Sequence, residues 1–180
     1  GDFTTRFSIQ SISKVIALTL AFRELGDELW LRVGVEPSGT TFNSLVQLES
    51  EQGIPRNPFI NAGAIVVCDI LLSLYSNPEQ EVIRFVRQLS GVPELEFSEC
   101  SALSELQTCY RNYALIYLMK DFGNIHNDID RVLHLYCRLC SIELSCQELS
   151  RLFLFLANDG NTPTLGRQVR SEEHTSELQS

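Results

Sequence analysis

The segment from Asn61 to Tyr75, NAGAIVVCDILLSLY, constrains the fold of this 180-residue chain more than any other. Its apolar residues fall on every side of the predicted helix, and a helix of that kind is buried by its neighbours. Other elements must therefore cover it. The composition, 44% hydrophobic and 21% charged, is ordinary for one globular domain with a sizeable core.

Further helices are predicted around this segment. Apolar periodicity predicts a helix over 11–25 that stops at Gly26. Asn77 and Pro78 supply the N-cap and the first residue of a helix that ends at Gly91. The same periodicity predicts three more helices, over about 101–122, 128–139 and 145–158.

Two segments break the helical pattern. Residues 33–42, which carry EPSGTTF, and residues 53–58, GIPRNP, contain prolines and glycines that interrupt any period. Long irregular loops inside a compact domain are usually functional. Because almost no segment shows strand alternation, we expect this chain to be mainly α-helical.

The charge pattern limits the partners. The net charge is -9, and phosphate contacts need clusters of Lys and Arg that this chain lacks, so we expect no nucleic-acid partner. The longest apolar stretches, around 62–74 and 152–157, are too short or interrupted to span a bilayer, so we expect no membrane partner. A small-molecule partner fits best.

The chain has six cysteines: Cys68, Cys100, Cys109, Cys137, Cys140 and Cys146. Cys137 and Cys140 lie at helical spacing in an apolar stretch, without a second paired cluster or a histidine at zinc-finger spacing. We therefore expect buried, reduced thiols and no metal site. Reduced thiols are typical of the cytosol, which predicts a cytoplasmic protein.

The stretch FSIQSISK places Ser11 three residues before Lys14, which is flanked by apolar residues. In one interpretation Ser8 or Ser11 caps a helix and the Lys14 ammonium reaches solvent. In the other, Ser11 is a nucleophile and the Lys14 amine, one helical turn away, accepts its proton. That role needs a neutral amine, and burial among apolar side chains lowers a lysine pKa. Ser11 would then stand in the first turn of the helix, where free N–H groups favour an oxyanion.

Five stretches, in order and spacing, resemble the serine-dependent glutaminase family: FSIQSISK, EPSGTTFNSL, GIPRNPFINAGAI, SELQTCYRN and LHLYCRLCSI. That family is similar in fold to serine β-lactamases and penicillin-binding proteins, an α+β fold that shares the S-x-x-K pair. The resemblance implies that this fragment is mainly the helical part, with the family's sheet largely missing. It implies hydrolysis of L-glutamine to L-glutamate and ammonia without a cofactor, and a homo-oligomer in the full-length protein.

The resemblance also implies roles for single residues. Ser11 and Lys14 match the catalytic nucleophile and base, and the substrate-binding positions are Ser11, Asn61, Glu105, Asn112 and Tyr136. A carboxylate pairs with a ligand ammonium, while amide and phenol groups hold a carboxylate. Glu105 and Asn112 are seven residues apart, so on one helix they share a face.

Each of three positions has a simpler local interpretation. Glu105 fits an ordinary acid in the first turn of a helix, Asn61 an N-cap and Tyr136 a core aromatic. Two other functions share features of the sequence: a penicillin-recognising acyl-serine hydrolase with the same S-x-x-K pair, and a non-catalytic helical interaction module.

The last residues do not share the pattern of the rest. Residues 170–180, RSEEHTSELQS, match the translation of a sequencing-library adapter, so we expect an artefactual tail after a partial glutaminase domain over 1–169. The family pattern continues with a tyrosine and a K-S-G strand that helps to form the oxyanion hole. Without that strand we expect this chain to be poorly active, because one lost oxyanion donor costs about 3 to 4 kcal/mol.

Overall fold

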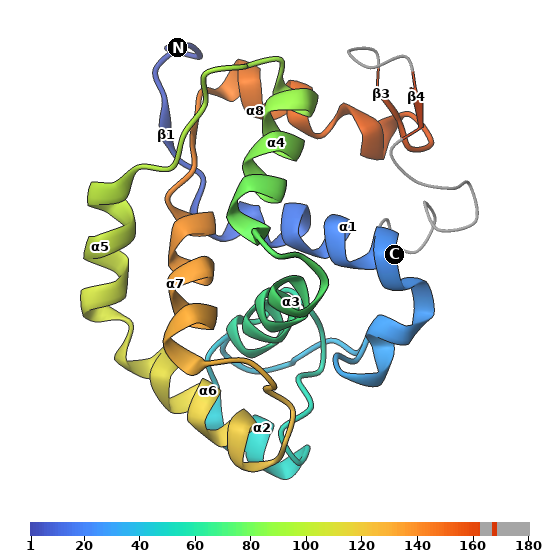
Figure 1. Ribbon diagram of the computed structural model, residues 1–180, viewed down its shortest axis with the longest axis vertical. Coiled ribbons are helices and arrows are strands. Elements are labelled where there is room, and N and C mark those ends of the chain that lie inside the picture. Colours follow the sequence, from blue (N-terminus) through green and yellow to red (C-terminus); the bar gives the residue numbers. More distant parts are fainter. Residues whose placement is uncertain (163–166, 169–180) are drawn as a thin grey trace.

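The computed structural model describes residues 1–162 and 167–168. It is mainly helical, with two small antiparallel sheets (Figure 1). The α-helices are α1 (Ser13–Leu25), α2 (Leu45–Ser50), α3 (Asn61–Leu74), α4 (Pro78–Ser90), α5 (Glu99–Thr108), α6 (Tyr110–Asp121), α7 (Ile129–Cys140) and α8 (Cys146–Leu152). Short 3-10 helices are η1 (Gln10–Ile12), η2 (Gly26–Leu31) and η3 (Leu154–Ala157), and the strands are β1 (Phe7–Ser8), β2 (Glu143–Leu144), β3 (Asn161–Thr162) and β4 (Arg167–Gln168).

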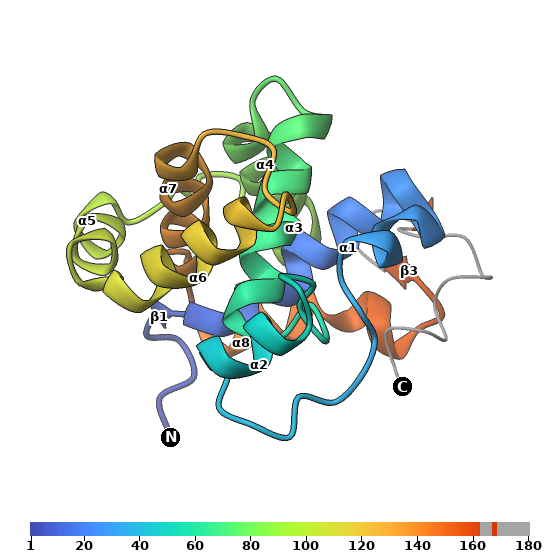
Figure 2. The same ribbon diagram turned by 90° about the horizontal axis from the view of Figure 1, so that it is seen from below.

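Helix α3 lies in the middle of the molecule, as its all-round apolar sequence predicts. Every residue from Ala62 to Leu71 is buried. Helices α1, α4, α6 and α7 pack against α3, and Figures 1 and 2 both show it enclosed by them. The side chain of Asp69, charged and fully buried, needs partners there.

A polar network surrounds Asp69. Its carboxylate accepts hydrogen bonds from Arg32 Nη2 (2.6 Å) and from the backbone N–H groups of His126 (3.2 Å) and Asn127 (2.8 Å). Asn124 accepts from Arg32 Nε through its side chain at 3.2 Å. The network therefore ties α3 to the end of η2 and to the loop between α6 and α7, and it satisfies a charge that would otherwise be unpaired in the core.

Gly63, in the first turn of α3, lies directly against the backbone of the preceding loop. A Cβ atom at this position would be 1.9 Å from the Asn57 carbonyl oxygen. Ordinary Cβ contacts are nearly twice as long, so no side chain fits unless the loop moves away.

Replacing Gly63 by alanine is therefore expected to destabilise the chain, although alanine in a helix normally stabilises by about 0.5 to 1 kcal/mol. Urea unfolding measures the effect, and we expect a loss of about 2 kcal/mol or more because the helix start must separate from the loop. A Gly63→Ala variant as stable as the parent chain would contradict this packing.

The predicted helix ends agree with the structure where capping residues mark them. The Asn77 side chain accepts from the Gln80 N–H, Pro78 is the first residue of α4, and Gly91 ends the helix with a φ of 74°. Asp128 caps α7 in the same way by accepting from the Arg131 N–H. These local groups satisfy the free backbone groups at a helix end.

Three predicted helix boundaries were wrong. The helix expected over 101–122 is divided into α5 and α6 at Cys109. The Thr108 hydroxyl donates to the Ser104 carbonyl (3.1 Å) and the Cys109 thiol to the Leu106 carbonyl (3.1 Å), so side chains take up the last carbonyls of α5. The helix expected over 145–158 ends as α8 at Leu152 and is followed by η3.

The third correction concerns the start of the helix predicted over 11–25. Residues 10–12 form the 3-10 turn η1, and α1 begins at Ser13 with Ile12 as its N-cap and no capping side chain. Neither Ser8 nor Ser11 is the helix cap, because no side chain caps α1. The Ser8 hydroxyl instead donates to the Cys140 carbonyl at 2.6 Å.

Strands β1 and β2 join the start of the chain to the residues after α7. Phe7 lies opposite Leu144 and Ser8 opposite Glu143. The Ile9 N–H then donates to the Ile142 carbonyl at 2.9 Å. This pairing fixes η1 beside the C-terminal end of α7.

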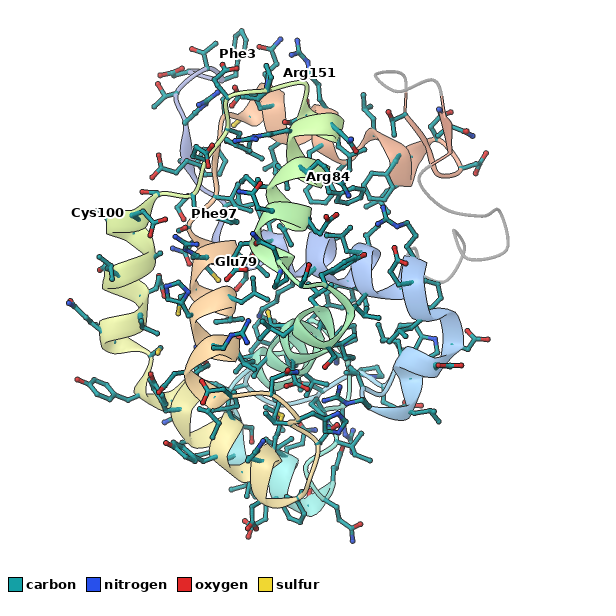
Figure 3. All side chains as sticks on the ribbon, in the orientation of Figure 1. Phe3, Glu79, Arg84, Phe97, Cys100 and Arg151 are labelled. Carbon is teal, nitrogen blue, oxygen red and sulfur yellow. The ribbon has the colours of Figure 1, made fainter. Side chains whose placement is uncertain are left out.

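The cysteines agree only in part with the prediction of buried thiols. All six are free; Cys68, Cys109, Cys137 and Cys140 are buried, but Cys100 and Cys146 are exposed. Figure 3 shows Cys100 at the outer edge of the molecule, at the start of α5. Within residues 1–162 and 167–168, no group of three or more His, Cys, Asp or Glu side chains is placed to hold a metal ion. None of the helices in these ranges has the length and hydrophobicity needed to cross a membrane.

Candidate active site

Ser11 lies in η1, directly before α1, and its side chain is exposed. Gln10, the residue before it, has a φ of 48°, a left-handed conformation that is uncommon for a residue with a side chain. The Ser13 hydroxyl donates to the Gln10 carbonyl at 2.7 Å and holds this turn. In the described part of the chain the Ser11 hydroxyl has no hydrogen-bond partner, so it is free to meet a ligand.

Lys14 lies in the first turn of α1 and is only 5% exposed. Its ammonium donates to the Phe59 carbonyl and to Asn61 Oδ1, both at 2.9 Å. The interpretation in which the ammonium reaches solvent is therefore wrong. A lysine ammonium has three N–H donors, so these two bonds leave one donor unused.

The surroundings of Lys14 favour a neutral amine. Burial lowers its pKa, and this outweighs the opposite effect of the Cys140 and Cys68 thiols, which raise the pKa when they ionise. Neither of its two hydrogen-bond acceptors is charged, and Lys14 forms no ion pair within the described residues. A buried cation without a counter-ion is typical of a lysine that acts as a base.

Asn61 connects Lys14 to Asn112. Asn61 Oδ1 accepts from Lys14, and Asn61 Nδ2 donates to Asn112 Oδ1 at 3.2 Å. Asn61 is the first residue of α3, whereas the N-cap is Ile60, so the interpretation of Asn61 as an N-cap is wrong. Its side chain points instead into the predicted site and joins α1, α3 and α6.

Glu105 lies on α5 and contacts the residue next to Ser11. Its Oε1 accepts from Gln10 Nε2 at 3.0 Å. Because α5 begins at Glu99, Glu105 is not in the first turn, and that simpler interpretation is wrong. The argument that Glu105 and Asn112 share one helix face is also wrong, since the break at Cys109 puts them on different helices.

Tyr136 lies on α7, is 7% exposed and belongs to the hydrophobic core. Burial is the main reason why its pKa is raised, and the neighbouring Cys140 and Cys68 thiols raise it further. Helix α7 packs against both η1 and α1. The core interpretation of Tyr136 therefore holds, and the residue lies on the helix that supports the Ser11 turn.

The structure adds contacts that sequence patterns did not identify. The Phe42 ring centroid is 5.7 Å from Lys14 Nζ, and the Phe42 carbonyl accepts from the Asn61 N–H at 2.8 Å. Phe42 is the last residue of the irregular loop over 33–42, and Phe59 directly follows the irregular loop over 53–58. Gln10 stood beside Ser11 in the sequence, but its bond to Glu105 spans 95 residues and has no local signature.

A cavity of about 770 Å³ adjoins this region. Phe42 and Phe59 form part of its wall, but none of the six predicted site residues does. Its other walls are Leu18, Asp27, Trp30, Val35, Glu36, Pro37, Ser38, Gly39, Thr40, Asn57, Pro58 and Ile60. The predicted catalytic groups therefore lie beside the cavity and not within its lining.

Comparison with known proteins decides the family. The glutaminase family model matches residues 1–180. The chain belongs to the glutaminase family. It is 58% identical over 180 residues to the glutaminase of Saccharophagus degradans and 56% identical over 170 residues to a glutaminase of Vibrio cholerae. The prediction of the family is confirmed.

Solved structures confirm the fold class predicted for this glutaminase family chain. A crystal structure of a Bacillus glutaminase matches with a TM-score of 0.90 and 32% identity, over 98% of this chain and 60% of that one. A probable glutaminase, ybaS, matches with a TM-score of 0.89 and 30% identity, over 99% of this chain and 58% of that one. The described residues thus form the mainly helical part of the glutaminase fold.

This chain is shorter than its glutaminase relatives. It covers 59% of the Saccharophagus protein and 56% of the Vibrio protein. The division into a domain over 1–169 and a tail over 170–180 stays a prediction, because residues 169–180 lie outside the described residues and the family match runs through them.

Proposed function

We propose that this chain carries the catalytic serine and lysine of a glutaminase, which hydrolyses L-glutamine to L-glutamate and ammonia. The single observation that supports this most is the buried Lys14 ammonium, which is held by two uncharged oxygen acceptors, one turn from an exposed serine hydroxyl. Relatives at 50–58% identity are named glutaminases.

The reaction divides into two acyl-transfer steps. Ser11 Oγ attacks the side-chain carboxamide carbon while the neutral Lys14 amine takes the hydroxyl proton. The C–N bond then breaks, ammonia leaves with a proton returned by Lys14, and a glutamyl ester remains on Ser11. Water hydrolyses this ester by the reverse proton path. No step needs a metal or an organic cofactor.

The hydrogen-bond chain suggests how the substrate is held. Lys14 donates to Asn61, and Asn61 donates to Asn112 Oδ1, so the Asn112 amide N–H groups stay available for the α-carboxylate of glutamine. Glu105 supplies the carboxylate that pairs with the α-ammonium group of glutamine. The proposed substrate-binding set has two further residues: Ser11, and Tyr136 on α7, the helix that supports the Ser11 turn.

L-Glutamine is expected to raise the melting temperature of the 180-residue chain, since a ligand at 100 times its Kd stabilises the folded state by about 2.7 kcal/mol. Glu105→Gln should lose most of this shift because the partner of the ammonium group is neutralised. Glu49→Gln, on α2, removes the same charge and should keep the shift. No shift for the parent chain, or equal shifts for both variants, would count against the binding set.

The melting shift and a mass measurement separate the other two functions. A non-catalytic helical interaction module has no pocket for an amino acid and should show no shift with glutamine. A penicillin-recognising hydrolase should gain the mass of a penicillin on Ser11 in intact-mass spectrometry. We expect no penicillin adduct, because Glu105 and Asn112 fit an amino acid that carries both charges.

Three finer statements stay predictions. Weak turnover is tested by measuring the rate of ammonia release from glutamine for this chain and for a full-length relative. Equal rates would contradict it. A cytoplasmic location and a homo-oligomeric full-length protein are tested by fractionation and by light scattering.

A further inference from the structure

Asn57, in the loop before α3, makes three hydrogen bonds that fix a turn. Its Oδ1 accepts from the Phe59 N–H (3.0 Å) and from the Ile60 N–H (3.1 Å), and its Nδ2 donates to the Glu36 carbonyl (2.8 Å). Asparagine commonly fixes turns by accepting from N–H groups two and three residues ahead. This one also ties the turn to the loop over 33–42.

The turn carries one of the two acceptors of Lys14. The Phe59 carbonyl and the Ile60 N–H belong to the same planar peptide unit. Asn57 Oδ1 holds the N–H side of that unit, and the Lys14 ammonium donates to its carbonyl side at 2.9 Å. The orientation of the carbonyl that binds Lys14 therefore follows from the bond that Asn57 makes.

The second acceptor depends on the same region. Asn61, whose Oδ1 binds Lys14 at 2.9 Å, directly follows this turn. The close approach of Gly63 to the Asn57 carbonyl presses the start of α3 against the loop. In the part of the chain that the structure describes, the Asn57 side chain forms no hydrogen bond with Ser11, Lys14 or Glu105, so its influence passes through the backbone.

We propose that Asn57 is a positioning residue, which aligns both oxygen acceptors of the Lys14 ammonium and keeps water from it. The inference rests on the proposed role of Lys14 as proton acceptor. Asn57→Ala frees the peptide unit and opens the amine to water. Because burial is the main reason for the lowered pKa of Lys14, the pKa should rise towards the ordinary lysine value.

The chain allows a direct measurement, because it contains two lysines, Lys14 and Lys120. With ¹³C-labelled lysine in a Lys120→Arg background, the Cε signal reports Lys14 alone as pH is raised. The titratable groups that face Lys14 are the thiols of Cys68 on α3 and Cys140 on α7, and all variants retain both. The second readout is the pH profile of Ser11 labelling by a glutamine analogue with a diazoketone in place of the amide.

The matched control is Asn77→Ala, because the Asn77 side chain accepts from the Gln80 N–H at the start of α4. We expect Asn57→Ala to raise the midpoint of the Lys14 signal and to slow Ser11 labelling at neutral pH by roughly tenfold or more, as misplaced catalytic groups do. Asn77→Ala should change neither. Asn57→Ser keeps a hydroxyl that accepts from the turn and should fall between Asn57→Ala and the parent chain.

An unchanged midpoint in Asn57→Ala, or the same change in Asn77→Ala, would overturn the proposal. If Asn57→Ala does not fold, Asn57→Ser decides, and an unchanged midpoint in that variant overturns it as well. The two readouts also separate this inference from the proposed function. An unlabelled Ser11 in the parent chain would contradict the function, whereas the Lys14 signal would still test Asn57.

Discussion

Replacing Ser11 by alanine is expected to abolish covalent labelling by the glutamine analogue with a diazoketone, because the labelled oxygen is removed. The predicted loss is roughly 10⁴-fold or more, as for nucleophiles of other acyl-transfer enzymes. Intact-mass spectrometry measures the adduct, and peptide mapping locates it. Mapping is essential here, because the exposed thiols of Cys100 and Cys146 also react with electrophiles.

Ser8→Ala is the matched control for this prediction. Ser8 lies three residues before Ser11, and its hydroxyl already donates to the Cys140 carbonyl. The control should therefore be labelled at the parent rate on Ser11. Labelling of the Ser11→Ala variant at the parent rate, on any residue, would remove Ser11 from the mechanism.

Replacing Asp69 by alanine is expected to cost about 3 to 5 kcal/mol of unfolding free energy, because breaking a buried ion pair leaves the partner charge uncompensated. Arg32, whose side chain is 18% exposed, would lose its carboxylate, and the His126 and Asn127 N–H groups would lose their acceptor. A domain is stable by about 5 to 15 kcal/mol, so this is a large part of the total. Urea unfolding at pH 7 measures it.

The control for Asp69 is an ion pair at the surface. Glu81 and Arg84 form an i,i+3 pair on α4 with the Arg84 side chain 63% exposed. Glu81→Ala should cost less than about 1 kcal/mol. Equal losses for the two variants would mean that the network around Asp69 does not hold α3 to the loop after α6.

The same carboxylate predicts a pH dependence. Burial opposes ionisation of Asp69, but hydrogen bonds from Arg32, Asn127 and His126 prevail and lower its pKa. A lowered folded-state pKa contributes stability that is present above the unfolded value, about 3.9, and is lost as pH falls through the folded value. Asp69→Asn should therefore be less sensitive to acid than the parent chain. Some sensitivity should remain, because the pKa of Glu148, paired with Arg6, is also lowered, to about 2.

The sequence predicted those parts of the fold that depend on local chemistry. The central position of α3 follows from its apolar residues, and both ends of α4 follow from Asn77, Pro78 and Gly91. The break at Cys109 was missed because no glycine or proline marks it. Side-chain bonds from Thr108 and Cys109 take up the last carbonyls of α5 there, and because such bonds also form within continuous helices, these residue types do not by themselves predict a break.

The candidate site was also predictable from the sequence only in part. Burial of Lys14 was one of the two interpretations that its apolar neighbours left open, and the choice of Asn61, Glu105, Asn112 and Tyr136 came from the family resemblance. The bonds from Lys14 to Asn61 and from Gln10 to Glu105 join residues 47 and 95 positions apart. No local pattern encodes contacts across such separations, so these bonds could be identified only from the packing of the helices.

The protonation of Lys14 tests the central claim most directly. In the Lys120→Arg chain labelled with ¹³C-lysine, the Lys14 Cε signal should titrate with a midpoint below the ordinary value of 10.5, and Ser11 labelling should accelerate with the same midpoint. A Lys14 midpoint at or above 10.5, or a labelling rate that does not follow it, would contradict a serine activated by a neutral amine.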